Sequence, residues 1–172
     1  MSLEIRAAEP GDARAVAAIH DEAVLAGTAT FRTEPRPLAD VEALIGDVRP
    51  FLVAERANEV VGWAGAAAYE DSNPYYAGVG EVAVYVGSSA RGQGAGGALL
   101  EGLAHAAVDA GMFKLVAKVF TTNEQSLRLF ERCGYTQVGT HVRHGRVRGD
   151  WKDVVVLEKH LMPRFNPSNE RA

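Results

Sequence analysis

The chain has 172 residues, with 47% hydrophobic and 23% charged side chains, a formal charge of −4 at pH 7 and an isoelectric point near 5.7. A chain of this size buries one sizeable core, so we expect a single domain over residues 1–163 and a surface tail over 164–172 that has little to bury. The net acidity argues against nucleic-acid binding, which goes with a strongly basic surface.

The N-terminal stretch predicts neither export nor a membrane anchor. Residues 1–16 carry early acidic side chains and lack the apolar centre of a signal peptide. No apolar run in the chain approaches the roughly 20 residues that span a bilayer. We therefore expect a cytoplasmic protein without a membrane partner.

The first third of the chain predicts a strand and two helices. Residues 3–6 alternate as a short strand, and Pro10 precedes a helical pattern of apolar residues. The segment 28–35, TATFRTEP, is a loop, and Pro37 opens a second helix that ends at Pro50. The apolar positions at helical spacing in the second helix are Leu38, Val41, Leu44, Ile45 and Val48.

The middle of the chain predicts a hairpin and one more strand. Two apolar runs within 51–70 flank a charged turn around Asn58, which is typical of a β-hairpin. A loop, 71–78, leads into the strand 81–86, EVAVYV, and a glycine-rich loop follows. The elements predicted after it are a helix over 94–110, a strand over 114–120, a helix over 123–133 and strands around 135–142 and 154–161.

The order of these elements is β-α-α-β-β-β-α-β-α-β-β. An alternating α/β chain would form a doubly wound parallel sheet, but here three strands come consecutively before the glycine loop. The order therefore favours a mixed, mainly antiparallel sheet with helices on its faces.

The glycine-rich loop predicts a phosphate site. Gly92, Gly94 and Gly97 spell G-x-G-x-x-G between a strand and a helix, a pattern typical of dinucleotide-binding loops. In a Rossmann fold the glycine loop follows the first strand, and an acidic residue after the next strand binds the ribose. Here about 80 residues precede the glycine loop, and the next strand ends in Thr121-Thr122. NAD is thus a minor alternative, and no Gly-Lys-Ser/Thr supports a P-loop.

Two longer stretches carry a family resemblance. GEVAVYVGSSARGQGAGGALL followed by VFTTNEQSLRLFERCGY resembles the GCN5-related N-acetyltransferase (GNAT) superfamily, with its R-x-x-G-x-G loop. IHDEAVLAGTATFRTEP and GDWKDVVVLEKHL resemble its phosphinothricin and methionine sulfoximine acetyltransferase branch. The resemblance covers roughly residues 3–161 and implies the α/β (α+β) GNAT fold, with about six or seven strands in a mixed sheet and about four helices.

The resemblance also implies acetyl-CoA as co-substrate and no metal. It places the backbone of Val84, Tyr85 and Val86 along the pantetheine arm. The residues implied for the pyrophosphate are Arg91, Gly92, Gln93, Gly94, Ala95, Gly96 and Gly97. Asn123 is implied as a hydrogen-bond partner of the cofactor arm; the alternative from the sequence is an N-cap of the helix that follows it.

Acetyl transfer to an amine needs a base for the amine proton and a donor for the developing oxyanion. The resemblance implies Glu81 as base and a backbone N–H near Val84 as donor; an exposed strand-end carboxylate is the alternative for Glu81. Phe130 stands where many relatives carry a tyrosine acid, and Tyr135 is expected in the core. The single cysteine, Cys133, excludes a disulfide framework and lacks a histidine partner, which favours direct transfer.

The acceptor site is expected in two loops. The branch uses an aromatic loop before the glutamate, here with Tyr75 and Tyr76 but with Ala77 where an arginine often stands. Phe31 and Glu34 are further candidates. A basic stretch is a solvated hairpin, a partial replacement for the missing arginine or a contact to the adenosine 3′-phosphate; it holds Arg143, Arg146, Arg148 and Lys152. His141 and His144, three apart on a predicted strand, are expected on opposite faces and make a poor metal pair.

The sequence thus predicts an N-acetyltransferase that acetylates the amino group of a small amino-acid-like substrate, of the phosphinothricin, methionine sulfoximine or methionine sulfone type. Two alternatives remain open at this stage. One is a GNAT enzyme for a polyamine, an aminoglycoside or a protein N-terminus. The other is a non-catalytic acyl-CoA-binding regulatory domain. Relatives of the branch imply a homodimer.

Overall fold

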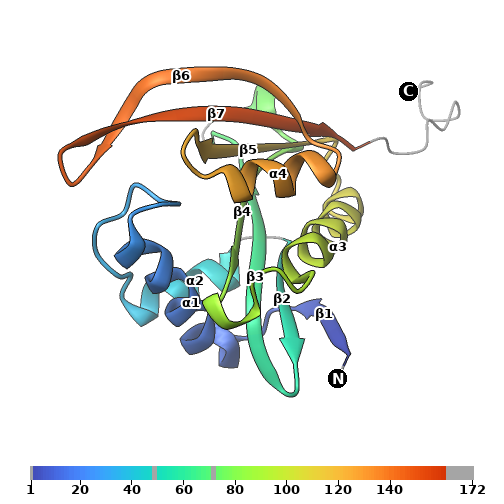
Figure 1. Ribbon diagram of the computed structural model, residues 1–172. Helices are drawn as coiled ribbons and strands as arrows, with labels where there is room; N and C mark the ends of the chain where they lie inside the picture. The colour runs from blue at the N-terminus through green and yellow to red at the C-terminus, as the bar shows by residue number, and fades with distance from the viewer. Residues whose placement is uncertain (1, 48–49, 71–72, 162–172) are drawn as a thin grey trace, which may run out of the picture.

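A seven-stranded mixed sheet runs through the part of the chain that the structure describes, residues 2–47, 50–70 and 73–161 of a computed structural model (Figure 1). The strands are β1 (Leu3–Ala7), β2 (Phe51–Arg56), β3 (Glu59–Ala68), β4 (Val79–Val86), β5 (Lys114–Phe120), β6 (Thr136–Val147) and β7 (Asp150–His160). They are ordered β1-β2-β3-β4-β5-β7-β6. Neighbours are antiparallel except β4 and β5, which are parallel.

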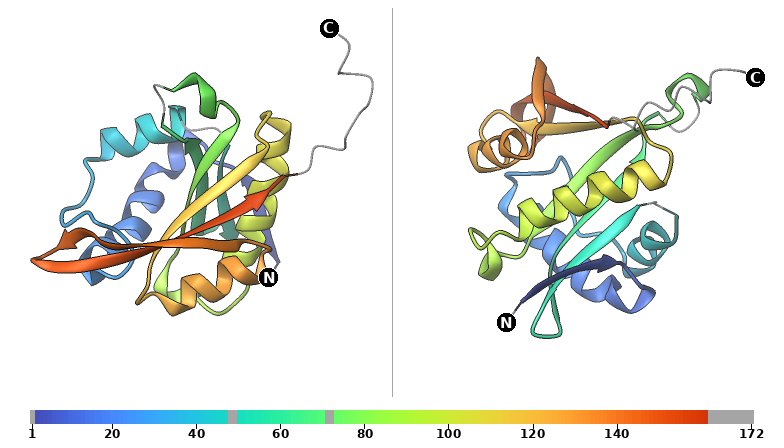
Figure 2. Two further views of the ribbon diagram at one scale, coloured as in Figure 1. Left: turned by 90° about the horizontal axis from the view of Figure 1, so that it is seen from above. Right: turned by 90° about the vertical axis from the view of Figure 1, so that its right-hand side faces the viewer.

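Helices cover both faces of this sheet, as the view from above in Figure 2 shows. The helices are α1 (Ala13–Ala26), α2 (Leu38–Asp47), α3 (Ala95–Asp109) and α4 (Glu124–Arg132). The first two pack on one face, in a cluster with side chains of β2 and β3 such as Val53 and Trp63. On the other face α3 buries Leu99 and Leu103 in the main core, and α4 contributes Phe130 to the same core.

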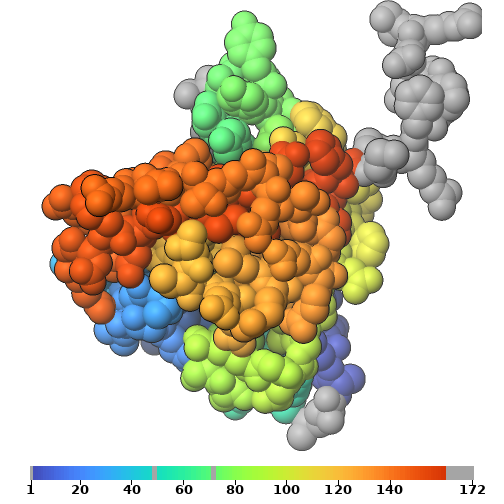
Figure 3. Space-filling model, turned by 45° about the horizontal axis from the view of Figure 1, so that its top comes forward, coloured from blue at the N-terminus to red at the C-terminus, as the bar shows by residue number. Residues whose placement is uncertain are grey.

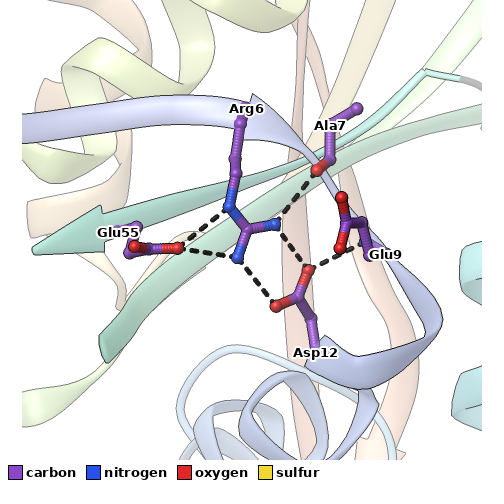
Figure 4. Close-up of polar contacts among 5 residues, drawn as sticks. All are labelled: Arg6, Ala7, Glu9, Asp12 and Glu55. Atoms are coloured by element: carbon purple, nitrogen blue, oxygen red, sulfur yellow. Dashed lines mark hydrogen bonds and ion pairs between the residues drawn. The ribbon is translucent and has the colours of Figure 1, made fainter. Parts of the chain in front are cut away.

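A charged cluster joins the N-terminal strand to the start of α1 (Figure 4). Arg6 donates two hydrogen bonds to the carboxylate of Asp12, at 2.8 and 2.9 Å, and two to Glu55 on β2, at 2.9 and 2.7 Å. Asp12 Oδ2 also accepts from the backbone N–H of Glu9 at 2.8 Å. Asp12 ends a 3₁₀ turn, Pro10–Asp12, and α1 begins directly after this turn.

The sheet divides between β4 and β5. Their parallel pairing ends at Val82 opposite Ala117, although β4 continues to pair with β3 as far as Val86. On the other side, β5 continues to pair with β7 as far as Phe120. The last four residues of β4 and the last three of β5 thus have facing edges that are not bonded to each other.

The predicted element order and the mixed, mainly antiparallel sheet are confirmed. The strand predicted from residue 81 begins earlier, at Val79, and the last two strands are longer than predicted and form a hairpin. The predicted tail, 164–172, and the predicted apolar position Val48 lie outside the described residues. None of the helices described is long and apolar enough to cross a bilayer.

Candidate active site

A wide cavity of about 950 Å³ lies where β4 and β5 separate. Its walls are the facing edges of the two strands, residues 82–86 and 118–120, together with the glycine loop and α4. Figure 3 shows this side of the molecule, where the blue segment after α1, the green glycine loop and the orange α4 come together. The volume is near the upper end of the roughly 300–1,000 Å³ typical of ligand pockets, so the cleft accommodates a large ligand.

The edge of β4 offers backbone groups to this cleft. Along a strand, peptide groups point alternately to the two neighbouring strands, so those of residues 83–86 directed at β5 have no ladder partner. An extended ligand with amide groups can add to such an edge as an extra strand would. Val84, Tyr85 and Val86, the residues expected along the pantetheine arm, all line the cleft here.

The glycine loop is shaped for close approach of a ligand. Gly92 and Gly94 have φ of +73° and +89°, a conformation that other residues rarely adopt, and α3 begins directly after Gly94. A Cβ on Gly97 would meet no atom within 4 Å, whereas one on Gly96 would lie 2.9 Å from Leu129. Because the free N–H groups of the first turn of α3 face the cleft, the loop suits a diphosphate.

Arg91 and Gln93 are both turned partly toward the protein. Arg91 lines the cleft, but its Nε donates to the backbone oxygen of Val86 at 3.1 Å and its guanidinium lies 3.6 Å from Glu22. Gln93 does not line the cleft, and its amide oxygen accepts a hydrogen bond from Arg56. Arg91 therefore also holds the loop to α1, while the side-chain amide and the backbone oxygen of Gln93 are hydrogen-bonded within the protein.

Asn123 caps α4, as the sequence allowed. Its Oδ1 accepts from the backbone N–H of Ser126 at 3.2 Å, and the residue also lines the cleft. The capping role is confirmed. The cofactor role stays a prediction, in which the side-chain amide nitrogen would donate to the cofactor.

Phe130 packs edge-on against Tyr135, whose buried hydroxyl has no partner among the described residues. Tyr135 is buried in the main core, as expected, and this burial raises its pKa.

Glu81 stands at the junction of this cleft with a second cavity. Its Oε2 accepts from Nζ of Lys118 at 3.0 Å, across the gap between the two strands. Lys118 also lies over the ring of Tyr69, 5.3 Å from its centroid. The base predicted from the sequence is thus partly exposed and held by a cation that the sequence analysis did not select.

The second cavity, of about 280 Å³, lies beside β4 and is lined by residues of α1, α2, the segment between them and β2–β4. The residues that line both cavities are Thr30, Arg32, Glu81, Val82, Ala83 and Tyr85. Aromatic rings close its inner part, since Trp63 lies 4.8 Å from Tyr85 and 5.1 Å from Phe51, between ring centroids. Two ligands bound in the two cavities would therefore meet at Glu81.

Burial controls the titratable groups of the second cavity. The pKa of His20 is lowered, first by burial and then by the charges of Arg36 and Arg32, although Asp21 opposes this. The pKa of Tyr85 is raised by burial, and a hydrogen bond with Thr30 opposes the rise. At neutral pH the imidazole and the phenol are both uncharged, so the arginines supply the positive charge here.

The four residues expected at the acceptor do not gather at Glu81. Phe31 lines the larger cleft, where it packs edge-on against Phe120 at 4.8 Å. Glu34 is exposed and lines neither cavity. Tyr75 and Tyr76 form a 3₁₀ turn outside both cavities. Arg32 and Arg36, which line the second cavity, are not among the residues predicted from the sequence, although Arg32 directly follows Phe31.

The basic stretch near the C-terminus stabilises the last hairpin. Arg148 donates to the backbone oxygens of Val24 and Leu25 at the end of α1, at 3.2 Å. Arg146 stacks on Trp151, with 4.1 Å between guanidinium carbon and ring centroid. Neither these arginines nor Arg143 and Lys152 line either cavity, so the solvated-hairpin interpretation is the one that the contacts support.

The expectation that His141 and His144 lie on opposite faces is wrong. The pairing of β6 with β7 is irregular between His141 and Gly145, and the two rings stack at 4.5 Å. This bulge breaks the two-residue alternation on which the expectation depended. Among the residues described, no group of three or more histidine, cysteine, aspartate or glutamate side chains is placed to hold a metal ion.

Comparison with known proteins gives concordant results. A family model described as acetyltransferase (GNAT) family matches residues 16–135. The chain is 34% identical over 171 residues to an L-methionine sulfoximine/L-methionine sulfone acetyltransferase of Pseudomonas paraeruginosa, covering 95% of this chain and 97% of that protein. It is 36% identical over 156 residues to the phosphinothricin N-acetyltransferase of Streptomyces viridochromogenes, covering 88% of this chain and 84% of that protein.

A solved structure agrees in fold. The GNAT superfamily phosphinothricin acetyltransferase of Sinorhizobium meliloti, in complex with acetyl-CoA, superimposes with a TM-score of 0.87. It is 27% identical, and the match covers 94% of this chain and 89% of the other.

Proposed function

The chain belongs to the GNAT acetyltransferase family, and we propose that it transfers the acetyl group of acetyl-CoA directly to the amino group of a small amino acid or amino-acid analogue. Methionine sulfoximine, methionine sulfone and phosphinothricin are the acceptor types, in keeping with the relatives' activities. The observation that carries the proposal is the meeting of a large cleft and a small cavity at a single carboxylate, Glu81.

The larger cleft fits acetyl-CoA. The first turn of α3 and the positive-φ glycines, Gly92 and Gly94, suit the diphosphate, and a Cβ on Gly97 would project into the open space that the cofactor needs. The unpaired edge of β4 suits the amide-containing arm. When bound, acetyl-CoA supplies an acyl group activated as a thioester.

Glu81 serves as the general base. An α-amine with a pKa of about 8 is about one-tenth neutral at pH 7. A useful fraction of the amine is therefore already in its nucleophilic form, and the demand on the base is modest. A backbone N–H near Val84 donates to the developing oxyanion. Burial raises the pKa of the Cys133 thiol, which disfavours a thiolate nucleophile and supports direct transfer.

The small cavity favours a small acceptor over the alternatives. Its volume of about 280 Å³ lies just below the range of drug-sized ligand pockets, so an aminoglycoside is too large for it. A polyamine would bring its positive charges to Arg32 and Arg36, which line the cavity and repel it.

A homodimer and a cytoplasmic location complete the proposal. One edge strand of the sheet, β6, is exposed along most of its length and carries the exposed apolar residues Val138 and Val142, a pattern typical of an edge covered in an assembly. A cytoplasmic location follows from the use of acetyl-CoA, which cells keep in their interior.

An acceptor screen tests the function. Thiol release from acetyl-CoA is measured with phosphinothricin, methionine sulfoximine, methionine sulfone and spermidine side by side. The proposal expects turnover with at least one of the amino-acid analogues and much less with spermidine. Tight binding of CoA without turnover of any amine would favour a non-catalytic acyl-CoA-binding domain instead. A titration with NAD checks the remaining alternative for the glycine loop.

A further inference from the structure

The small cavity has a cationic wall that the proposed base does not explain. Arg32 and Arg36, both in the segment between α1 and α2, line it. Among the described residues, neither guanidinium has a hydrogen-bond or ion-pair partner. By contrast, Arg6 is held by two carboxylates and Arg148 by two backbone oxygens. Two arginines that line a cavity and have no partner in the described part of the chain are suited to bind an anion.

Buried nitrogen atoms of residues that line the same cavity are also without a partner within the described chain. Nε of Arg32, Nε1 of Trp63 and Nδ1 of His20 are each buried without a hydrogen-bond partner, and all three residues line the cavity. Buried polar atoms in native proteins are nearly always satisfied, so each one without a partner requires an explanation. Two of these atoms, Nε of Arg32 and Nε1 of Trp63, can only donate, so the cavity suits a ligand that accepts hydrogen bonds.

The small cavity carries charges of both signs. Among its described lining residues, Glu81 is the one acidic side chain; Arg32, like Glu81, also lines the larger cleft, whereas Arg36 lines the small cavity alone. The arginines supply the positive charge. A zwitterion fits this arrangement when its anionic end faces the arginines and its amine faces Glu81.

We propose that Arg32 and Arg36 bind the carboxylate of the acceptor and thereby direct its amine to Glu81. A guanidinium is suited to this because it donates two parallel hydrogen bonds to a carboxylate and keeps its charge at all relevant pH values. The loop that often supplies an arginine in similar proteins has Ala77 here. The segment between α1 and α2 supplies the arginines instead.

This inference rests on the proposed function, and substrate pairs that differ in one charge separate the two. Each amino acid accepted in the screen is compared with its carboxamide, which keeps the amine and the side chain but lacks the negative charge. The variants are Arg32→Gln and Arg36→Gln, and Arg14→Gln, an exposed position on α1 that lines neither cavity, is the matched control. Thermal unfolding verifies that each variant is folded.

The wild-type protein should prefer the acid to the carboxamide by about tenfold or more in kcat/KM. Each arginine variant should raise KM for the acid by about ten- to hundredfold, as expected when one partner of a charge pair is removed. KM for the carboxamide and for acetyl-CoA should stay within about twofold, and Arg32→Lys should restore part of the preference. The control should behave like the wild type.

Two results would overturn the inference while the proposed function stands. One is equal use of acid and carboxamide by the wild-type protein, and the other is a variant that changes the KM values of both substrates alike. If no amine is turned over, the proposed function fails. The carboxylate site can then still be tested by calorimetric titration of methionine sulfone into the protein with bound CoA. Binding that Arg32→Gln abolishes and Arg14→Gln preserves supports the carboxylate site, and equal or absent binding overturns it.

Discussion

Nζ of Lys118 lies 3.0 Å from Oε2 of Glu81, and the two residues stand on β5 and β4 where these strands separate. Lys118 is the first residue of β5 beyond the last paired position, Ala117. The side chains are 36% and 40% exposed, so their ion pair adds at most about 1 kcal/mol to stability. The main effect of the ion pair is on position, because it holds the Glu81 carboxylate at the junction of the two cavities.

Replacement of Glu81 by glutamine should abolish most of the activity without loss of cofactor binding. The amide keeps the size of the side chain and an oxygen that can accept from Lys118, but it cannot take a proton from the amine. We expect kcat to fall by about 10²- to 10⁴-fold, the usual contribution of a general base. The measurement is thiol release at saturating acceptor, with calorimetric titration of acetyl-CoA beside it.

The matched control is Glu42→Gln, an exposed carboxylate on α2 that lines neither cavity. It should retain wild-type kcat. Undiminished acetyl transfer by the Glu81→Gln protein would show that another group, or solvent, takes the proton.

Replacement of Lys118 by methionine tests the positional role. The variant keeps the length and the apolar stem of the side chain but frees the Glu81 carboxylate to rotate. We expect kcat to fall by about three- to thirtyfold, with KM for acetyl-CoA within about twofold and the melting temperature almost unchanged, because an exposed ion pair contributes little stability. Lys118→Arg should recover much of the loss. If the melting temperature falls while kcat is kept, the lysine is structural and this assignment is wrong.

Addition of a methyl group at Gly97 should weaken acetyl-CoA binding but not the fold. A Cβ there meets no protein atom within 4 Å and would occupy the space assigned to the cofactor. Since alanine is favoured over glycine in a helix by about 1 kcal/mol, the Gly97→Ala protein should be as stable as the wild type or more so. KM for acetyl-CoA should rise by about tenfold or more. Gly46→Ala, in α2, offers the same open space away from the cleft and should leave this KM unchanged. Wild-type affinity for acetyl-CoA in both variants would show that the cofactor does not bind at the glycine loop.

Much of the fold could be predicted because local patterns determine it. Hydrophobic periodicity distinguished strands from helices, and the order of elements followed directly. The glycine loop was recognisable because the conformations at Gly92 and Gly94 leave few alternatives to glycine. The stacked histidines could not be foreseen, since a bulge in β6 changes which face each side chain takes.

The acceptor side of the site was harder to predict for a physical reason. Arg32 and Arg36 lie in an irregular segment, where no periodicity indicates the direction of a side chain. Lys118 lies on a regular strand, but its partner comes from 37 positions earlier in the chain. Both relationships depend on tertiary packing, so the sequence could show the residue types but neither the contact of Lys118 with Glu81 nor the cavity that Arg32 and Arg36 share with it.

The charged cluster at Arg6 predicts a pH-dependent stability. Hydrogen bonds from Arg6 lower the pKa of Asp12, although partial burial opposes this and the backbone N–H of Glu9 helps. The folded pKa is therefore below the unfolded value of about 3.9, so the stabilisation is fully present above that pH and is lost as the pH falls through the folded pKa. At pH 7, Asp12→Asn should lower the free energy of unfolding by about 1–3 kcal/mol, because Arg6 keeps its bonds to Glu55.

Urea unfolding at pH 7, 5 and 3 provides the measurement. The difference between wild type and Asp12→Asn should be constant from pH 7 to pH 5 and should shrink toward pH 3, where the wild-type carboxyl begins to take up a proton. Glu4→Gln, an exposed position on the same strand as Arg6, should show no comparable loss. A difference that is independent of pH would mean that the carboxylate charge does not stabilise the cluster, and that the shape and hydrogen bonds of residue 12 account for the whole effect.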